Sequence, residues 1–430
     1  MQESYTMTEI KIPCGKNFLS AQVPESELLG IFHAALPQAA PDPDAEVKRA
    51  MESPIDSPPL SELARGKKNA VIIISDHTRP VPSRHILPLM LAELRKNNPA
   101  IDITLLVATG FHRLTTPEEL RSKVGDKIFE EEKIIVHDSG DPAMLQKIGT
   151  LPSGGELIVN KLALEADLLV SEGFIEPHFF AGFSGGRKSV LPGIAARETV
   201  LANHCAEFIA HPRARTGSIP GNPIHEDMLF AAKAAKLAFV VNVVIDQKKQ
   251  IVKAFAGNVE SAHAAGCAFL KDLAEVKVPE SDIVITSNGG FPLDQNLYQS
   301  VKGMTAGEAA VRPGGVIIIC AACNDGHGGE SFRKTLADSP SPQAVLEKIL
   351  QVPRNKTVPD QWESQILARV LTKAEVILVS PEIDPELPLS MHLKHAFSLE
   401  EALQKARTLC NTAVPRISVI PDGVSVIVTN

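Results

Sequence analysis

Short apolar runs, each about as long as a β-strand, recur along the chain and are separated by polar turns and by stretches with helical periodicity. From Asn69 onward, AVIIIS (70–75), DITLLVA (102–108) and ADLLVSE (166–172) are each followed by a polar or glycine-rich turn. Strands that alternate with helices are typical of α/β proteins with mostly parallel sheets, so we expect that fold class. The expected strands cover 70–75, 102–108, 166–172, 239–245, 282–287, 316–321, 374–380 and 425–430, and the expected helices of the second half cover 300–311, 341–351, 361–373 and 399–407.

The start and the middle of the chain are less regular. We expect a short strand at 9–12 and a helix at 25–36, followed by a connector rich in Pro, Asp and Ser. The stretch LKDLAEVKVPESD (270–282) interrupts the pattern before it restarts, and we place a domain boundary there. A chain of 430 residues has room for two α/β domains of ordinary size.

Composition excludes several classes of protein. The net charge of −8 argues against a nucleic-acid-binding protein, which would carry a basic face. No apolar stretch reaches the roughly 18 residues that a membrane-spanning helix needs. Six cysteines are too few for a disulfide scaffold, and the first residues lack the features of a secretory signal. We therefore expect a cytoplasmic protein with reduced thiols, which does not bind nucleic acid or membranes.

Four polar segments come directly after expected strands. They carry His, Arg and Lys within Gly- and Pro-containing loops, at 76–79 (DHTR), 110–113 (GFHR), 176–188 and 288–302. In open α/β sheets, ligands bind beyond the carboxyl ends of the strands, where such loops converge. Loops are often polar for no functional reason, but four of this composition predict one shared active site.

The segment AGFSGGRKSVLPG (181–193) places Gly185 and Gly186 ahead of Lys188. Glycines let the backbone approach a phosphate closely, and a lysine can then neutralise the phosphate charge. The segment does not match the P-loop or the dinucleotide fingerprint G-x-G-x-x-G. A flexible turn with solvated charges remains the alternative.

Two further features concern metal and redox chemistry. His204 lies in VLANHCAEF, on an expected helix, where it is either a core or capping residue or a single metal ligand. A single protein ligand implies that other donors come from a cofactor. Cys320 and Cys323 form a C-x-x-C pair at the end of an expected core strand, and because no second pair accompanies it we interpret it as structural.

Six motifs together resemble the nickel-dependent lactate racemase family. They run in order and at matching spacing from about Lys67 to the C-terminus, and they are DHTRPVP, ATGFHR, EPHFFAGFSGGRKSVLPGIA, ANHCAEFIAHPRARTGSIPGNPIHEDM, SNGGFPLDQNLYQSVKG and DGHGGESF. Each motif is short, but six in register are specific. The resemblance implies two α/β domains, 1–274 and 279–407, with 412–430 returning to the first domain and the active site in the cleft between the two domains.

The resemblance also implies a cofactor, the nickel-pincer nucleotide. This pyridinium mononucleotide carries a thioamide and a thiocarboxylate, and its sulfur, carbon and sulfur atoms hold nickel while a protein histidine supplies the fourth donor. Lys188 resembles the lysine of the thioamide link, His204 the nickel ligand and Asp76 a residue in contact with the cofactor, whose phosphate suits Gly185 and Gly186. Because other proteins must synthesise such a cofactor, the resemblance implies cofactor-biosynthesis proteins as partners.

The substrate implied by the resemblance is a small 2-hydroxy acid, with lactate as the first choice. Arg79 and Lys302 resemble the groups that bind its carboxylate, with Tyr298 and Gln299 beside them and Trp362 over the substrate. The two aromatic residues favour a small substrate, because their rings fill the space that a longer chain or a second carboxylate would need.

The reaction implied by the resemblance is racemisation by hydride transfer. His112 and His178 resemble the two acid/base histidines, one of which takes the hydroxyl proton while the hydride leaves C2 for the cofactor. A planar 2-keto acid results, and the return of hydride to its other face gives the opposite enantiomer. The alternatives are racemisation of malate or of a longer-chain or sugar acid, an NAD-dependent hydroxyacid dehydrogenase, whose fingerprint is missing, and a non-catalytic cofactor carrier.

Overall fold

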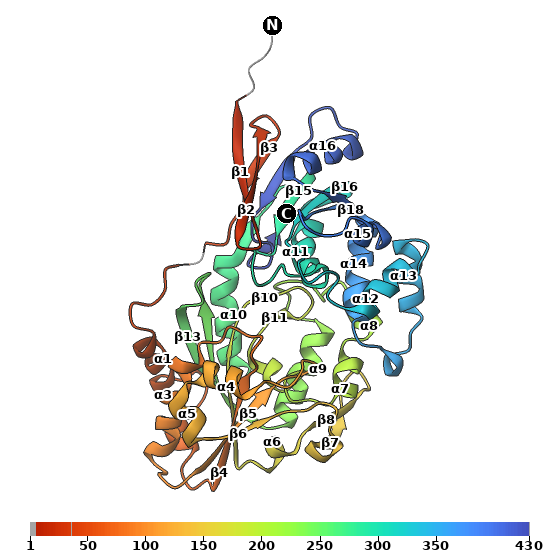
Figure 1. Ribbon diagram of the computed structural model, residues 1–430. Coiled ribbons are helices and arrows are strands. Elements are labelled where there is room, and N and C mark those ends of the chain that lie inside the picture. The colour runs from red at the N-terminus through yellow and green to blue at the C-terminus, as the bar shows by residue number, and fades with distance from the viewer. Residues whose placement is uncertain (1–5, 36, 430) are drawn as a thin grey trace. The chain divides into compact units, whose positions relative to one another are not determined.

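The computed structural model describes residues 6–35 and 37–429, which divide into two compact units (Figure 1). The N-terminal unit contains residues 37–204 and 211–273, and the C-terminal unit contains residues 6–35, 205–210 and 274–429. Each unit is built on a six-stranded, mostly parallel sheet with helices packed against it. The expected α/β fold class is therefore confirmed.

The N-terminal sheet has the strand order β13-β12-β9-β4-β5-β6. Five strands are parallel, and β13 is antiparallel to β12. Two small antiparallel hairpins, β7–β8 and β10–β11, stand apart from the sheet. The strands are β4 (Asn69–Ser75), β5 (Asp102–Ala108), β6 (Lys133–Val136), β7 (Leu145–Thr150), β8 (Glu156–Asn160), β9 (Leu168–Phe174), β10 (Pro177–His178), β11 (Gly182–Phe183), β12 (Leu237–Ile245) and β13 (Ile251–Gly257).

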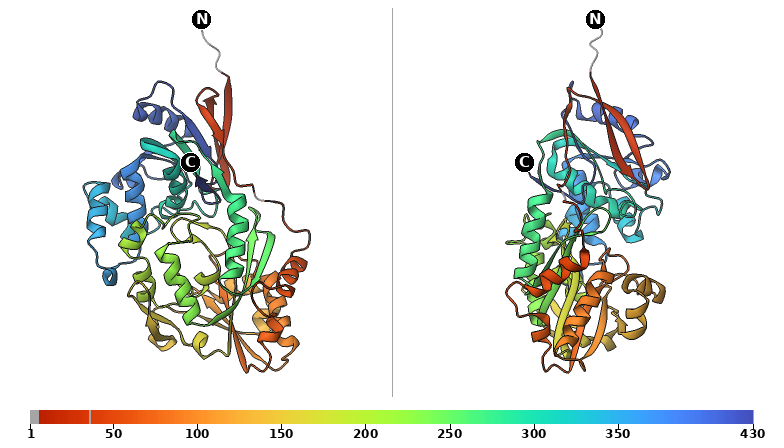
Figure 2. Two further views of the ribbon diagram at one scale, coloured as in Figure 1. Left: turned by 180° about the vertical axis from the view of Figure 1, so that it is seen from behind. Right: turned by 90° about the vertical axis from the view of Figure 1, so that its left-hand side faces the viewer.

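Helices cover both faces of this sheet. Side chains from the first five helices form one apolar core with alternate residues of the strands, such as Ile72 and Ile74 of β4. On the other face, the Phe269 ring of α10 packs against Phe255 of β13, and Figure 2 shows α10 running beside these strands. The helices are α1 (Pro43–Glu52), α2 (Leu60–Leu63), α3 (Ser83–Lys96), α4 (Pro117–Val124), α5 (Asp126–Glu131), α6 (Lys161–Glu165), α7 (Arg197–Asn203), α9 (Pro223–Ala234) and α10 (Ser261–Ala274), with the 3₁₀ turns η1 (Pro142–Met144) and η2 (Gly186–Ser189).

The C-terminal sheet is fully parallel, with the order β18-β17-β16-β15-β19-β3. The hairpin β1–β2 and helix α16 share an apolar core with one face, and α11 and α14 contact strands of the sheet and each other. The elements are β1 (Met7–Cys14), β2 (Asn17–Pro24), β3 (Leu28–Ile31), α8 (Ala206–Ala210), β14 (Glu275–Lys277), β15 (Ser281–Ser287), α11 (Leu297–Ala310), β16 (Val311–Cys320), α12 (Glu330–Ala337), α13 (Pro342–Leu350), η3 (Arg354–Lys356), α14 (Gln361–Lys373), β17 (Glu375–Val379), α15 (Glu386–Ser390), β18 (Lys394–Ala396), α16 (Leu399–Cys410), β19 (Ile417–Ile420) and β20 (Ile427–Thr429).

The ends of the chain differ from the sequence-based expectation. The helix expected at 25–36 is wrong, because Leu28–Ile31 instead forms β3 and pairs with β19 at the edge of the C-terminal sheet. The strand expected at 9–12 is one arm of the hairpin β1–β2. Near the C-terminus, β20 pairs with β14 inside the C-terminal unit rather than with a strand of the N-terminal sheet. The domain boundaries that we proposed stay a prediction.

The strand order of each sheet reverses at one point, and this point positions functional loops. In the N-terminal sheet the reversal lies between β4 and β9, and in the C-terminal sheet it lies between β15 and β19. Loops leaving the carboxyl ends of two such strands diverge to opposite sides and leave room for a ligand. The polar segments 76–79 and 176–188 follow β4 and β9, and 288–302 follows β15.

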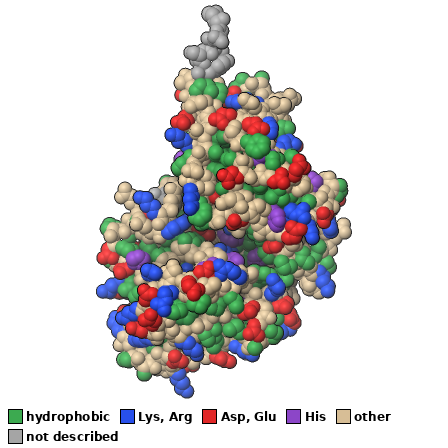
Figure 3. All heavy atoms as spheres, in the orientation of Figure 1, with side chains coloured by type: hydrophobic (Ala, Val, Ile, Leu, Met, Phe, Trp, Pro, Cys, Tyr) green, Lys and Arg blue, Asp and Glu red, His purple; other side chains and the backbone are tan. Residues whose placement is uncertain are grey.

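The surface charges and the cysteines say little more about the function of the protein. On the face drawn in Figure 3, acidic and basic side chains are interspersed. None of the helices in the described part of the chain has the length and apolar character needed to cross a lipid bilayer. The six cysteines are buried and free, so the Cys320/Cys323 pair is not a disulfide, which agrees with its structural interpretation.

Candidate active site

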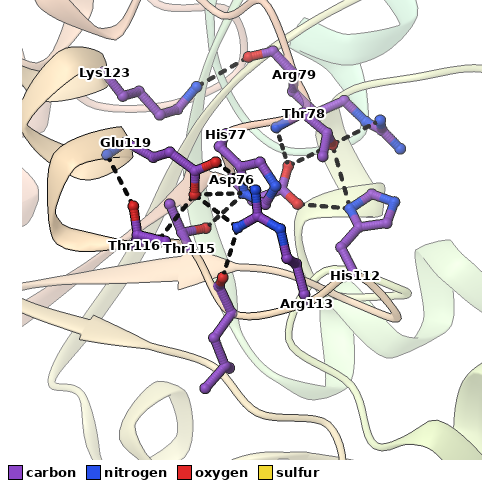
Figure 4. A network of polar contacts seen from close by, with 11 residues as sticks. Asp76, His77, Thr78, Arg79, His112, Arg113, Thr115, Thr116, Glu119 and Lys123 are labelled. Atoms are coloured by element: carbon purple, nitrogen blue, oxygen red, sulfur yellow. Dashed lines mark hydrogen bonds and ion pairs between the residues drawn. The ribbon is translucent and has the colours of Figure 1, made fainter. Parts of the chain in front are cut away.

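The loops after β4 and β5 bring an aspartate and a histidine together (Figure 4). The Nδ1 atom of His112 lies 2.6 Å from Oδ2 of Asp76. The Asp76 side chain is 1% exposed, whereas that of His112 is 38% exposed. A carboxylate accepts the proton of Nδ1, so in the neutral ring the lone pair is on Nε2. This tautomer suits His112 to act as a general base.

Thr78 connects this pair to Arg79. Its hydroxyl donates to Oδ1 of Asp76 at 2.8 Å and accepts from Nη1 of Arg79 at 3.0 Å. Burial alone would raise the pKa of Asp76, but the hydrogen bond and charge of His112, followed by the charge of Arg79 and the Thr78 hydroxyl, bring this pKa below its ordinary value. Asp76 therefore stays ionised. Sequence reasoning did not single out Thr78, because a threonine in a loop carries no signal by itself.

A cavity of about 470 Å³ lies next to Arg79. Lys123 lines it and donates from Nζ to the backbone carbonyl of Arg79 at 3.1 Å. Burial lowers the pKa of Lys123, and the charge of the buried Glu172 opposes this shift. Because Arg79, Arg84 and Lys123 all line the cavity, this side of the loop is suited to an anionic group.

The loop after β9 places a second histidine beside a lysine. Nδ1 of His178 accepts from the backbone N–H of Ala181 at 3.3 Å, and its Nε2 lies 3.1 Å from Nζ of Lys188. Which group donates in the contact between His178 and Lys188 depends on the tautomer of the ring. The ring of His178 also packs edge-to-face on Phe180, at a centroid distance of 4.5 Å.

His204 ends helix α7 and is buried. Its Nδ1 lies 3.0 Å from the carbonyl oxygen of Val200, which can only accept, so the lone pair of the ring is on Nε2. Burial first, and then the charge of Lys188, lowers the pKa of His204 to about 3. A neutral imidazole whose second nitrogen is fixed by a carbonyl has the form that metal ligands require. No group of three or more His, Cys, Asp or Glu side chains in residues 6–35 and 37–429 is placed to hold a metal ion.

Arg187 shapes the glycine-rich loop from within. Its guanidinium is 1% exposed and donates to the carbonyls of Ala181 and Phe183, each at 2.7 Å. Gly185 and Gly186 both have positive φ, and a Cβ on Gly185 would lie 2.8 Å from the carbonyl oxygen of Phe174. The loop therefore needs glycine for its conformation, whereas contact of Gly185 and Gly186 with a phosphate stays a prediction. Sequence reasoning treated Arg187 only as part of a basic loop.

The candidate residues of the C-terminal unit come from two helices. Tyr298, Gln299 and Lys302 lie on the first turns of α11, and Trp362 lies on the first turn of α14. Asn288, directly after β15, fixes α11 by donating from its amide to the Gln299 carbonyl at 2.6 Å and accepting from Gly303 N–H at 2.9 Å. The amine of Lys302 donates to Oε1 of Gln299 at 2.6 Å.

A buried carboxyl group accompanies Lys302. Glu363 is 1% exposed, and burial raises its pKa to about 8, against the opposing charge of Lys302. One of its oxygens, Oε1, has no hydrogen-bond partner among the described residues. Buried carboxyl groups of this kind concentrate at functional sites. Nothing in the sequence distinguishes Glu363 from other helical glutamates.

The structure thus places the twelve predicted site residues in two groups. Eight lie in the N-terminal unit, as the Asp76–Arg79–His112 network and the His178–Lys188–His204 cluster with Gly185 and Gly186. A backbone hydrogen bond of 3.0 Å from Gly110 to Gly193 joins the loop of His112 to the segment that follows Lys188. The other four lie in the C-terminal unit. The individual roles of these residues, and the cleft between the domains, stay predictions.

Comparisons with known proteins match the chain along almost its whole length. Residues 14–217 match the family model described as the lactate racemase N-terminal domain, and residues 276–428 match the lactate racemase C-terminal domain. The chain is 56% identical over 424 residues to a lactate racemase of Thermoanaerobacterium thermosaccharolyticum, covering 98% of this chain and 99% of that protein. It is 51% identical over 424 residues to a lactate racemase of Lactiplantibacillus plantarum, covering 98% of this chain and all of that protein.

A solved structure is also similar. The lactate racemase apoprotein from Thermoanaerobacterium thermosaccharolyticum matches with a TM-score of 0.96 and 55% identity, covering 98% of this chain and all of that chain. A Thermotoga maritima protein matches with a TM-score of 0.65 and 20% identity, which supports the fold alone.

Proposed function

The chain belongs to the lactate racemase family, and we propose that it is an isomerase that interconverts D- and L-lactate with a nickel-pincer nucleotide as cofactor. The observation that carries the proposal is 51–56% identity to two lactate racemases along almost the whole chain. The geometry of the candidate active site supports it, because two imidazoles and a lysine lie on loops after β5 and β9, the two strands that flank β4 in the N-terminal sheet.

The residues of the N-terminal unit fit such a cofactor. Nε2 of His204 is suited to donate to nickel, because Nδ1 is bound to the Val200 carbonyl. The Lys188 amine, held beside His178, is suited to a covalent link in its unprotonated form. When bound, the nickel-pincer nucleotide supplies an acceptor for a hydride, which Asp, His and Lys side chains cannot supply.

The chain's own side chains bind the substrate and move its proton. Arg79 and Lys302 provide positive charges for the carboxylate, and the planar guanidinium of Arg79 can bind it through two hydrogen bonds. Tyr298 and Gln299 lie beside Lys302 as hydrogen-bonding groups, and Trp362 adds an apolar wall. Carboxylate binding orients the C2 hydrogen and the hydroxyl group of either enantiomer.

Two acid/base groups are needed because the two enantiomers present their hydroxyl groups differently. We assign the proton transfers to His112 and His178, because imidazole is the side chain that most often serves as a general acid or base. One removes the hydroxyl proton as the C2 hydrogen leaves as hydride, which converts the substrate to a planar 2-keto acid. The other supplies the proton when the hydride returns to the opposite face. Asp76 holds His112 in one tautomer throughout.

The test is racemisation by protein produced together with the enzymes that synthesise the cofactor. Pure L-lactate and pure D-lactate are each incubated with the protein, and the enantiomers are separated by chiral chromatography. We expect both reactions to reach the same near-equal mixture, with malate and 2-hydroxybutyrate converted more slowly. Lys188→Ala is the matched control, and it should lack both the covalent adduct by intact mass and the activity.

Two outcomes would contradict the proposal. Faster conversion of malate or of a longer acid would move the function to another 2-hydroxy acid. Oxidation of lactate with added NAD, without cofactor loading, would indicate a dehydrogenase instead.

A further inference from the structure

The guanidinium of Arg187 is a buried cation that no carboxylate compensates. Arg187 lies in η2, directly before Lys188, and its side chain is 1% exposed. Burial lowers the pKa of Arg187 to about 10, so the group still carries its charge at neutral pH. Among the residues that the structure describes, no Asp or Glu forms an ion pair with it. A buried charge without a counter-ion is costly unless hydrogen bonds satisfy it.

Carbonyl oxygens of the loop that precedes Arg187 take the place of a counter-ion. Nη2 donates to the carbonyl of Ala181 and Nη1 to that of Phe183, each at 2.7 Å. Two longer contacts, of 3.4 and 3.3 Å, join Nη1 to the carbonyls of Ser184 and Gly185. The guanidinium is planar and its donors point in fixed directions, so these carbonyls bind it together only in one arrangement of the loop.

Two histidines of helices α9 and α10 contact the same guanidinium. Nε of Arg187 donates to Nδ1 of His225 at 3.1 Å, and Nη1 lies 3.1 Å from Nε2 of His263. Burial, followed by the charge of Arg187, lowers the pKa of His225 to about 4 and that of His263 well below its ordinary value. Both rings are therefore neutral and add no second charge. A Cβ on Gly186 would lie 2.6 Å from the His263 ring, so the loop packs directly on α10.

A chain of contacts leads from Arg187 to two candidate site residues. Ala181, whose carbonyl accepts from Arg187, donates its backbone N–H to Nδ1 of His178 at 3.3 Å. Nε2 of the same ring lies 3.1 Å from Nζ of Lys188. His178 is also paired with Gly182 across the hairpin β10–β11, and Arg187 binds the carbonyls on both sides of Gly182. The guanidinium therefore fixes the strand that faces His178.

We propose that Arg187 is a positioning residue that holds the loop 181–185 so that the imidazole of His178 and the amine of Lys188 meet. The inference rests on the proposed function, in which Lys188 carries the cofactor and His178 transfers a proton. A guanidinium buried inside the loop acts through its neighbours and not on the substrate. A displacement of about 1 Å between reacting groups can cost roughly 100-fold in rate. We therefore expect loss of Arg187 to lower both cofactor attachment and turnover by the attached cofactor.

Three variants test this role. Arg187→Met removes the charge and every donor but keeps an unbranched apolar side chain. Arg187→Lys keeps the charge and up to three donors without the planar fork, so it is the conservative variant. His225→Phe keeps a ring on α9 and removes the acceptor of Nε, so it loosens Arg187 without changing the loop itself. If His225 acts through Arg187, the double variant Arg187→Met/His225→Phe should be no worse than Arg187→Met. Arg65→Met, at an exposed position of the same unit, is the matched control.

The first measurement uses protein produced together with the enzymes that synthesise the cofactor. Intact mass gives the adduct per chain, and steady-state kinetics give kcat per adduct and KM for lactate. We expect Arg187→Met to form less adduct and to lower kcat per adduct by about 10- to 100-fold, with little change in KM. Arg187→Lys should recover part of both losses, and His225→Phe should lie between Arg187→Met and wild type.

A purely structural role of Arg187 predicts a different result. Arg187→Met would then have a lower Tm, while its adduct and its kcat per adduct stayed at the wild-type level below that temperature, and this result would overturn the proposal. Should Arg187→Met fail to fold, Arg187→Lys and His225→Phe decide the same question, since each weakens the grip on the loop less severely.

The second measurement does not depend on activity. Hydrogen exchange of cofactor-free protein, followed by mass spectrometry, reports on the loop through a peptide covering 177–189. In this peptide the N–H groups of Ser184 and Gly186 donate to the Glu176 carbonyl at 2.9 Å and to Asn242 at 2.6 Å. We expect faster exchange in Arg187→Met, an intermediate rate in Arg187→Lys and the wild-type rate in Arg65→Met.

The exchange experiment also separates the two proposals. If the wild-type protein forms no adduct and racemises no lactate, the proposed function fails, and the exchange rates still decide whether Arg187 holds the loop. Wild-type exchange of the 177–189 peptide in folded Arg187→Met would rule that role out.

Discussion

The two units both carry candidate site residues, but they do so from different elements. In the N-terminal unit the side chains come from loops directly after β4, β5 and β9, and they are tied to one another, as in His112–Asp76 and His178–Lys188. In the C-terminal unit they come from the first turns of α11 and α14. The N-terminal groups are the ones to which we assign proton exchange and metal binding. The C-terminal groups are a cation, an amide and two aromatic side chains, which are better suited to recognition.

This difference predicts that variants of the N-terminal unit change turnover, whereas variants of the C-terminal unit change substrate affinity and selectivity. The distinction would be weakened if a variant of the N-terminal unit changed only KM, or if a variant of the C-terminal unit changed only kcat.

The largest effect is expected for His204. His204→Ala should keep the covalent adduct on Lys188 but lose most nickel, since no other imidazole replaces Nε2, and the activity loss should exceed that of a lost general base. Intact mass reports the adduct and elemental analysis reports nickel. His33→Ala, at an exposed position of the C-terminal unit, is the control and should retain both. Full nickel in His204→Ala would remove this residue from the metal site.

The next effect concerns proton transfer. His112→Ala should retain nickel and lower kcat by roughly 10²- to 10⁴-fold, because a general base typically contributes that much. Asp76→Asn should lower kcat less than His112→Ala does. The amide oxygen of the new side chain would still accept from Nδ1 of His112, so only the negative charge is lost. Steady-state kinetics in both directions of racemisation separate kcat from KM. If His112→Ala changed KM alone, the residue would belong with the recognition groups instead.

A smaller effect is expected for Lys302. Lys302→Met keeps the apolar stem and removes the charge, so KM for lactate should rise by about 10- to 100-fold, corresponding to the roughly 1.5–3 kcal/mol of a hydrogen bond to a charged group. The change in kcat should be smaller. Lys348→Met, at an exposed position of α13, controls for general loss of charge. A fall in kcat with unchanged KM would contradict the assignment of this unit to recognition.

The smallest effect is a pH dependence of stability from Glu363. The folded protein keeps this proton up to about pH 8, whereas the unfolded chain loses it near the ordinary pKa of 4.5. Between these values the folded state binds more protons, so the contribution of Glu363 to the free energy of unfolding falls as pH rises. Glu363→Gln removes this penalty, and its Tm relative to wild type should increase from pH 5 to pH 9.

Differential scanning calorimetry of the cofactor-free protein measures this difference. Glu347→Gln, at an exposed position of α13, is the matched control and should follow the wild type at every pH. A constant Tm difference between Glu363→Gln and wild type across this range would mean that the carboxyl is ionised in the folded protein.

The sequence predicted the central strands well because their apolar runs are long and uninterrupted. The expected runs at 70–75, 102–108 and 282–287 coincide with β4, β5 and β15 within about a residue. It failed where a short segment takes its structure from a distant partner. Leu28–Ile31 is a strand because β19 lies beside it, and nothing within 25–36 indicates a pairing with residues almost 400 positions later.

The residues of the candidate site were likewise predictable where the signal is local, and they were missed where it depends on a contact with another residue. Titratable residues in glycine-rich loops after strands could be found from their positions, and the family motifs assigned roles to them. Thr78 and Arg187 were missed because their importance lies in a hydrogen bond to a neighbour, not in their residue type.

The pairing of β3 with β19 also has a consequence for synthesis on the ribosome. Residue 31 is made 386 residues before residue 417, so at roughly 5–20 residues per second the nascent edge strand waits about 20–80 s for its partner. The hairpin β1–β2 waits with it, exposing Ile10, Ile12 and Val23, which are fully buried in the finished protein. Translation therefore produces the cover of the second sheet long before the sheet itself, and chaperones that shield apolar segments should bind this chain first at its amino end.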